Sequence, residues 1–216
     1  ADKIVAGIKI VLRLFPNATA IIGIEDNKPE AIKVLTEACS SEDKINVKPV
    51  KTKYPQGSDR TLVKVLTGIK VRPIERSYKK GVVVSNVNSL LNAYEAVVEG
   101  KPLIKRIFTV SGDDIVNPGN FRVCLGTAFN EVIEAAGGTI QDPEKYIDGG
   151  TMMGYAMYDL SAPITKTSSA LIAVKKDDVS NSETTPCINC AKCVSVCPMQ
   201  LLPNKLSRLS NRNLME

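Results

Sequence analysis

The first hundred residues alternate short apolar runs with segments whose apolar positions recur at helical spacing. The recurrence indicates amphipathic helices, and the short runs between them indicate buried strands. The predicted helices lie within residues 4–15, 27–39, 58–68 and 88–100. The predicted strands lie within residues 19–24, 45–55 and 81–87. Strands that alternate with helices in this way are typical of an α/β layer.

Residues with special backbone preferences mark the ends of these elements. Asn27 and Ser58 are expected N-caps, because their side chains accept hydrogen bonds from the free N–H groups of a first helical turn. Gly68 and Gly100 are expected to end their helices. Pro49 has no N–H to donate, so the strand that contains it is predicted at a sheet edge.

The pattern changes after Pro102. Two extended runs, 103–112 and 121–126, flank a Pro-Gly turn, and a helix follows them with Thr127 as its expected N-cap. Further extended pieces return by residue 174. A hairpin, one helix and returning strands together predict a β-grasp-like α+β module.

Composition excludes several classes of chemistry. The chain of 216 residues has no histidine, which excludes Ser-His-Asp and Cys-His nucleophiles and His-ligated zinc or haem. The net charge of +5 is mild and spread along the sequence, which argues against nucleic-acid binding and is compatible with an acidic partner surface. No apolar run reaches the roughly 18 residues that a membrane span needs. Because the chain opens at Ala1 with a helical pattern, we expect it to be a piece of a longer protein.

The stretch CINCAKCVSVCP carries the most specific signal in the chain. Its cysteines are Cys187, Cys190, Cys193 and Cys197. The spacing of two, two and three residues, followed by proline, is that of a bacterial-type [4Fe–4S] motif, in which the fourth cysteine serves a second cluster. The alternative is a structural zinc knot, although such sites normally use two separated C-x₂-C pairs. The other two thiols, Cys39 and Cys124, lie in apolar segments and are interpreted as small hydrophobic residues.

Several longer stretches, in this order along the chain, resemble the RnfC family. They are YPQGSDRTLVKVLTG, GVVVSNVNSLLNAYEAVVEGKPLIKRIFTVSGD, NPGNFRVCLGTAFNEVIEAAGG, DGGTMMGYAM and CINCAKCVSVCPMQLLPNKL. RnfC is the peripheral flavin and iron–sulfur subunit of the Rnf ion-pumping ferredoxin:NAD⁺ oxidoreductase. The resemblance implies an electron-transfer subunit at the cytoplasmic face of the bacterial inner membrane, with FMN, NAD(H) and two [4Fe–4S] clusters as cofactors. Its implied partners are the membrane and ferredoxin-type Rnf subunits.

The resemblance also implies a domain order. Residues 1–101 are expected to form the second half of a flavin-binding α/β domain, and residues 102–174 a β-grasp module of the soluble-ligand-binding (SLBB) type. A charged linker is expected at 175–186, and residues 187–216 are expected to be a short helical tail that forms the first half of a two-cluster ferredoxin-type domain. The family's glycine-rich flavin loop and its second cysteine motif are not in this sequence. We therefore expect the fragment alone to be inactive, with clusters absent or incomplete.

Three polar residues are the expected flavin contacts. By the resemblance, Ser85, Asn86 and Asn88 lie at a strand-to-helix turn that meets the flavin phosphate, where the free N–H groups of a helix start favour an anion. The alternative is ordinary N-capping by Asn88 or Ser89. Glu25, Asp26 and Glu30 could form a nicotinamide-side acidic cluster, but helix-start preference explains them better.

Two alternative functions remain open from the sequence. One is the related cobalamin reductase, which shares the domain order of RnfC. The other is a non-redox docking module in which the cysteines hold structural zinc. Acid-labile sulfide distinguishes the zinc site from an iron–sulfur cluster.

Overall fold

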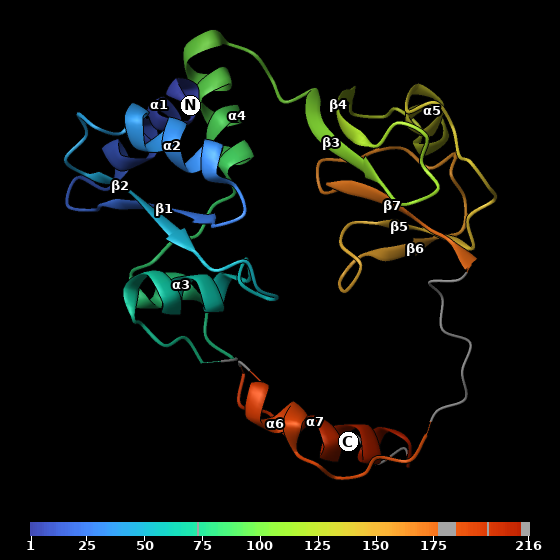
Figure 1. Ribbon diagram of the computed structural model, residues 1–216. Helices are drawn as coiled ribbons and strands as arrows, with labels where there is room; N and C mark the ends of the chain where they lie inside the picture. Colours follow the sequence, from blue (N-terminus) through green and yellow to red (C-terminus); the bar gives the residue numbers. More distant parts are fainter. Residues whose placement is uncertain (73, 177–184, 198, 213–216) are drawn as a thin grey trace. The chain divides into compact units, whose positions relative to one another are not determined.

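The computed structural model describes residues 1–72, 74–176, 185–197 and 199–212 (Figure 1). The chain divides into two compact units, Ala1–Pro102 with Pro186–Glu216, and Leu103–Thr185. Residues 177–184 of the expected linker, and Pro198 of the cysteine motif, lie outside the described residues. The domain boundaries expected from the sequence stay a prediction.

The first unit contains a parallel β-sheet flanked by helices. Strands β1 and β2 pair so that Ala20 lies opposite Ile45 and Glu25 opposite Val50. The elements are α1 (Asp2–Leu14), β1 (Ala20–Glu25), α2 (Pro29–Ala38), β2 (Ile45–Val50), α3 (Asp59–Thr67), the 3₁₀-helix η1 (Ser77–Lys80) and α4 (Val87–Glu99). The strand–helix alternation expected from the sequence is therefore present.

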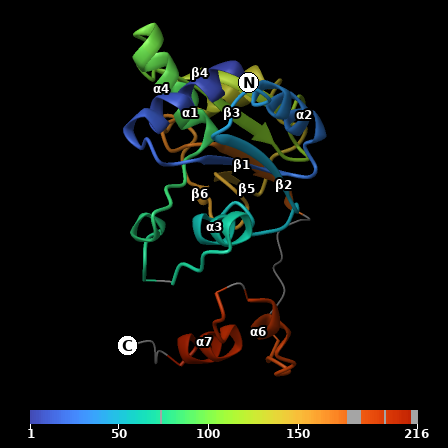
Figure 2. The ribbon, with the colours of Figure 1, turned by 90° about the vertical axis from the view of Figure 1, so that its left-hand side faces the viewer.

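The alternation of side chains along β1 places helices on both faces of this sheet. Ile22 and Ile24 are buried in a core with residues of α1 and α2. Gly23 points to the opposite face, where Leu62 and Leu66 of α3 lie 3.0 Å from the position a Cβ atom would occupy. Figures 1 and 2 show α1 and α2 on one side of the strands and α3 on the other. This layering confirms the α/β fold class.

Helices α1 and α4 pack closely together. Lys3 of α1 forms an ion pair of 2.6 Å with Glu99 of α4, which also pairs with Lys101 at 2.6 Å. About one turn further along α1, Gly7 faces the backbone of Leu90 in α4. The close packing of α1 against α4 at this point therefore requires a glycine, because a side chain would overlap the α4 backbone.

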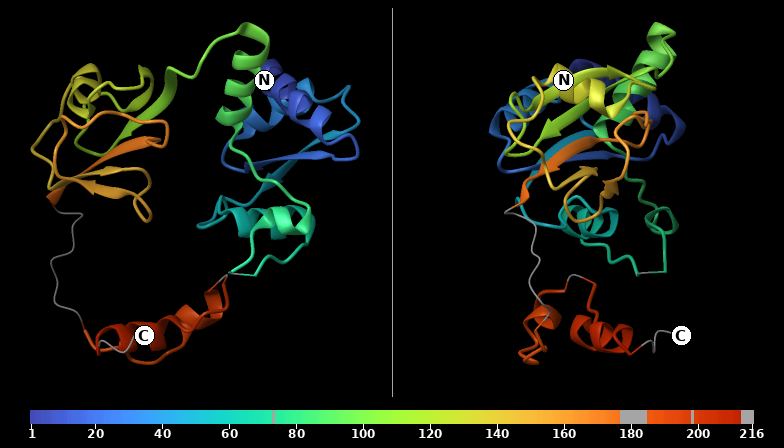
Figure 3. Two further views of the ribbon diagram at one scale, coloured as in Figure 1. Left: turned by 180° about the vertical axis from the view of Figure 1, so that it is seen from behind. Right: turned by 90° about the vertical axis from the view of Figure 1, so that its right-hand side faces the viewer.

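The second unit is a mixed five-stranded sheet in the order β4-β3-β7-β5-β6 with one helix (Figure 3). Its elements are β3 (Lys105–Ser111), β4 (Gly119–Cys124), α5 (Phe129–Ala135), β5 (Lys145–Asp148), β6 (Tyr155–Met157) and β7 (Ala170–Val174). Strand β3 pairs antiparallel to β4 and parallel to β7. Phe108 of β3 and Phe129 of α5 meet edge to face in the core, with ring centroids 5.8 Å apart. This is the hairpin, helix and returning strands that the sequence predicted.

The cysteine segment carries two short helices, α6 (Lys192–Val196) and α7 (Pro203–Ser210), which contact each other. The helical tail expected from the sequence is therefore present. No helix within the described residues combines the length and the apolar character needed to cross a bilayer.

One predicted element is absent from its expected place. Residues 81–87 do not form a strand, and Val83 and Val87 are 71% and 41% exposed. The described strands of this unit are β1 and β2, and neither pairs with this segment. A valine-rich run becomes a buried strand only when it finds a hydrogen-bonding neighbour and a layer to cover it.

Candidate functional site

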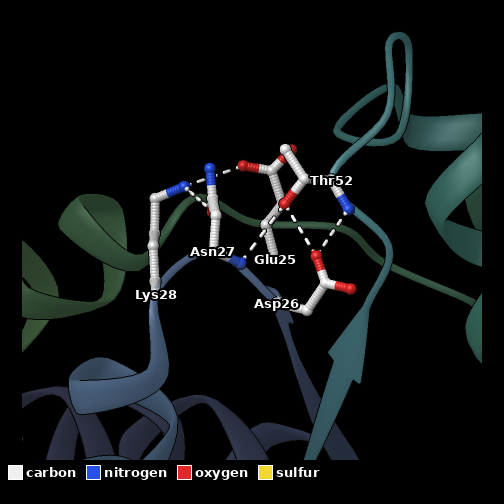
Figure 4. Close-up of polar contacts among 5 residues, drawn as sticks. All are labelled: Glu25, Asp26, Asn27, Lys28 and Thr52. Carbon is white, nitrogen blue, oxygen red and sulfur yellow. Dashed lines mark hydrogen bonds and ion pairs between the residues drawn. The ribbon is translucent and has the colours of Figure 1, made fainter.

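The carboxyl ends of β1 and β2 lie side by side, because the two strands are parallel and in register. Ligands of open α/β sheets bind at this edge. Glu25 ends β1 and residues 26–28 follow it, while Lys51 and Thr52 follow β2 (Figure 4).

Asp26 fastens the end of β1 to the end of β2. The Thr52 N–H and hydroxyl donate to Oδ1 of Asp26 at 3.0 and 2.8 Å, and Lys51 Nζ lies 3.1 Å from Oδ2. These bonds, the Thr52 backbone bond first, lower the pKa of Asp26 to about 2. The carboxylate therefore holds the sheet edge together, which is a different role from the helix-start preference expected from the sequence.

The neighbouring polar groups at this edge also pair with one another. Lys28 Nζ donates to Glu25 Oε2 at 2.8 Å and to Asn27 Oδ1 at 2.9 Å, while the Asn27 N–H donates to Thr52 Oγ1 at 3.3 Å (Figure 4). Lys28, not Asn27, occupies the N-cap of α2. Asn27 was therefore wrongly predicted as a cap, because its side chain pairs with Lys28.

We expect Asp26→Asn to change how the stability of the protein depends on pH in the acid range. A carboxylate whose folded pKa lies near 2, below its ordinary 3.8, adds stability that is present above pH 4 and is lost as the pH falls toward 2. The melting temperature of the variant should therefore lie below that of the native protein above pH 4, and the two should converge near pH 2. Thermal unfolding against pH at fixed ionic strength measures this difference.

Asp43→Asn provides the matched control, since Asp43 is exposed and forms no ion pair among the described residues. It should change the melting temperature little at any pH. A difference for Asp26→Asn that is equally large at pH 6 and pH 2 would contradict the carboxylate's proposed role.

The expected flavin-contact residues lie together at the start of α4. Asn86 is the N-cap, and its side-chain oxygen accepts from the Asn88 N–H at 2.9 Å. Ser85 precedes the helix, and all three residues are exposed. The capping expected of Asn88 or Ser89 is thus performed by Asn86. The exposed helix start keeps the geometry that suits an anionic group.

The cysteines of the motif lie on an exposed loop and the short helix α6. Cys187, Cys190 and Cys193 are exposed, and Cys197 is half-buried. The loop between the first cysteines curls through two left-handed residues, Asn189 at φ 57° and Ala191 at φ 59°. Within the residues that the structure describes, no three Cys, Asp or Glu side chains already converge as a metal-ligand group.

The donor set of this segment nevertheless fits an iron–sulfur cluster. Thiolates are the ligands that such clusters prefer, and none of the four sulfurs is packed into a core. Gln200, at φ 56°, turns the chain so that the Leu201 N–H points to Cys197 Sγ at 3.4 Å. Hydrogen bonds to ligand sulfur are one of the means by which proteins set cluster potentials.

Two further sequence interpretations have different outcomes. Cys39 is buried in the core of the first unit, as expected, and burial raises the pKa of its thiol. Cys124, expected on an apolar face, is exposed at the end of β4. Met152 and Met153, in the turn between β5 and β6, are 70% and 78% exposed. An outward-facing position at the end of β4 explains the exposure of Cys124, because periodicity does not say which face of a strand is covered.

Known families match both units. Residues 1–95 match the family described as the Nuo51 FMN-binding domain, and residues 107–156 match the SLBB domain. The whole chain is 40% identical, over 216 residues, to the C subunit of the proton-translocating ferredoxin:NAD(+) oxidoreductase complex of Clostridium ljungdahlii. The chain belongs to the RnfC family of ion-translocating oxidoreductase complexes. This confirms the resemblance seen in the sequence.

Other members of the RnfC family show the same relation. The corresponding protein of the Na(+)-translocating ferredoxin:NAD(+) oxidoreductase complex of Acetobacterium woodii is 35% identical over all 216 residues. That of the ion-translocating oxidoreductase complex of Yersinia pestis is 39% identical over 207 residues, or 95% of this chain. The chain spans 47% and 49% of the first two relatives, and 33% of the third.

Proposed function

We propose that this chain is part of an electron-transfer subunit that relays electrons between NAD(H), FMN and [4Fe–4S] clusters in an ion-translocating ferredoxin:NAD⁺ oxidoreductase. The observation that carries the proposal is the motif of four cysteines, whose sulfurs lie outside any packed core. The names of the family members support the complex and its reaction. They also favour this function over the cobalamin reductase.

Each cofactor would have its own residues. Cys187, Cys190 and Cys193 would ligate one cluster through thiolates, and Cys197 would ligate a second. Bound clusters supply one-electron transfer, while the flavin exchanges two electrons with NAD(H). The chain's part is to hold the thiolates, curl the loop at Asn189 and Ala191, and donate the Leu201 N–H to Cys197 sulfur.

The flavin proposal concerns the start of α4. Ser85, Asn86 and Asn88 would present N–H groups and small polar side chains to the flavin phosphate, supported by the match of residues 1–95 to an FMN-binding family. We further propose that the subunit works at the cytoplasmic face of the bacterial inner membrane. Its partners there would be the membrane and ferredoxin-type subunits of the complex.

The test is the content of iron, zinc, acid-labile sulfide and FMN per chain after anaerobic reconstitution. It should be measured on the full-length protein and on residues 1–216. Two [4Fe–4S] clusters predict about eight iron and eight sulfide in the full-length protein, and fewer in the shorter chain, which holds one motif. FMN should be retained by the full-length protein. One zinc without sulfide in both proteins would show a structural knot and would end the electron-transfer proposal.

A further inference from the structure

The five-stranded sheet of the second unit carries an apolar strip on the face that points away from its helix. Leu171 and Ala173 of β7 are buried in the core together with residues of α5. Because side chains alternate along a strand, Ile172 and Val174 point to the opposite face. Ile147 of β5 lies opposite Ile172 in the antiparallel register and shares that face. The apolar strip consists of Ile147, Ile172 and Val174.

A glycine-rich loop covers part of this apolar strip. Residues 149–154 connect β5 to β6, and the Gly154 N–H donates to the Gly150 carbonyl at 2.7 Å. A Cβ atom on Gly154 would lie 2.5 Å from Ile147 Cγ2, so the loop backbone rests directly on the strip. Ile147 is accordingly only 9% exposed, although no helix of the unit covers its face among the described residues. The loop thus forms a wall above the strip.

The apolar strip is the floor of a groove with a volume of about 370 Å³. Its walls include Thr151 of the glycine-rich loop, and Gly112 and Asp113, which follow β3. Gly112 lets this turn lie against β7, because a Cβ atom there would overlap the Ala173 carbonyl oxygen. All the lining residues belong to the second unit. The volume lies at the lower end of the range of small-molecule sites.

The groove contains one positive charge that no described residue compensates. Asp113 pairs with Lys175 at 3.2 Å, so the charge of its carboxylate is balanced. Lys145, the first residue of β5, also lines the groove. Lys145 is exposed and forms no ion pair with another residue that the structure describes. The groove therefore combines an apolar floor with a single available cation.

We propose that this groove binds a small organic anion, with a carboxylate on Lys145 and an apolar body on the strip. A few polar groups in a mostly apolar site usually set the orientation of a ligand, and here Lys145 and the Thr151 hydroxyl can do so. A phosphate group would call for more donors, such as an arginine fork or a helix N-terminus. The lining residues include no arginine.

The inference goes beyond the proposed function, because none of the residues assigned to FMN or to the clusters lies in this groove. It also goes beyond the SLBB match, which specifies neither the face of the sheet nor the chemistry of a ligand. A partner's strand would add to a sheet edge, formed here by β4 or β6, whereas the floor of the groove belongs to the inner strands β5 and β7. A small molecule is therefore the occupant that fits.

The test measures the binding of anilinonaphthalene sulfonate, an aromatic monoanion, to the full-length protein by titration calorimetry. Phenylbutyrate and phenylbutyramide serve as competitors, because they share a shape and differ in charge. Lys145→Gln removes the cation of the groove. Lys105→Gln is the matched control, since Lys105 is also the exposed first residue of a strand in this unit and forms no ion pair among the described residues. Val174→Trp fills the groove and keeps the cation.

Lys145→Gln should weaken the binding of the probe about tenfold, because it removes a hydrogen bond to a charged group. Lys105→Gln should change the binding by less than about twofold. Val174→Trp should abolish it, and phenylbutyrate should displace the probe where phenylbutyramide does not. The melting temperature of each variant shows whether it folds. If Val174→Trp does not fold, the two glutamine variants and the competitors decide the question.

Three results would overturn the proposal. Native affinity in Lys145→Gln, or equal losses in both glutamine variants, would show that Lys145 does not select the anion. Full binding to a folded Val174→Trp would place the probe outside the groove. Equal displacement by the amide and the carboxylate would show a merely apolar site. FMN, iron and sulfide contents should be the same in all preparations, so the outcome is independent of the electron-transfer function.

Discussion

Cys190→Ser should lower the iron and sulfide content of the reconstituted full-length protein by about four atoms each. Cys190 is the middle member of the three closely spaced thiols, and a serine oxygen is a hard donor that replaces a soft thiolate poorly. The second cluster, which Cys197 would serve, should remain. The visible absorbance of the protein should therefore fall to roughly half, consistent with the loss of one of two clusters.

Cys124→Ser makes the same chemical change outside the motif. Cys124 is an exposed free thiol at the end of β4, so its replacement should leave iron, sulfide and stability unchanged. Iron content that falls equally in both variants would point to a general effect of thiol loss. Full iron content in Cys190→Ser would remove Cys190 from the ligand set.

Much of the fold could be predicted because its periodicities are strong. The helical spacing of Ile4, Ile8 and Leu12 led to α1, and the short run at 19–24 led to β1. The motif cysteines could be identified from spacing alone, because ligand spacing is a local property of the chain. The hairpin, helix and returning strands of the second unit followed from turns and β-rich runs.

The wrong predictions concern positions whose structure depends on residues far away in the sequence. Thr127 was expected to cap α5, but Ala128 is the N-cap, and the Phe129 and Asn130 N–H groups donate to Ala162 and Leu160 carbonyls. Backbone carbonyl groups about thirty residues further along the chain thus replace a side-chain cap. No local sequence pattern predicts this pairing. Ser58 holds the predicted N-cap position of α3 without a side-chain bond.

Gly7→Ala is expected to destabilise the first unit strongly. The added Cβ would lie 2.1 Å from the Leu90 carbonyl oxygen and 2.7 Å from its carbon. Both atoms belong to the backbone of α4, so no rotamer change relieves the overlap, and the two helices must move apart. Overpacking of this kind costs about 3 kcal/mol or more, whereas the helix propensity of alanine returns about 1 kcal/mol. The free energy of unfolding should fall by about 2 kcal/mol, or about 10 °C in melting temperature.

Gly57→Ala tests the same substitution without the overlap. Gly57 also lies in the first unit, and no atom comes within 4 Å of the position its Cβ would take. Its free energy of unfolding should change by less than about 0.5 kcal/mol. Denaturant unfolding of the two variants, followed by circular dichroism, measures both values. Equal stability of the two variants would show that α1 and α4 tolerate a wider spacing, and that the close approach at Gly7 does not hold them together.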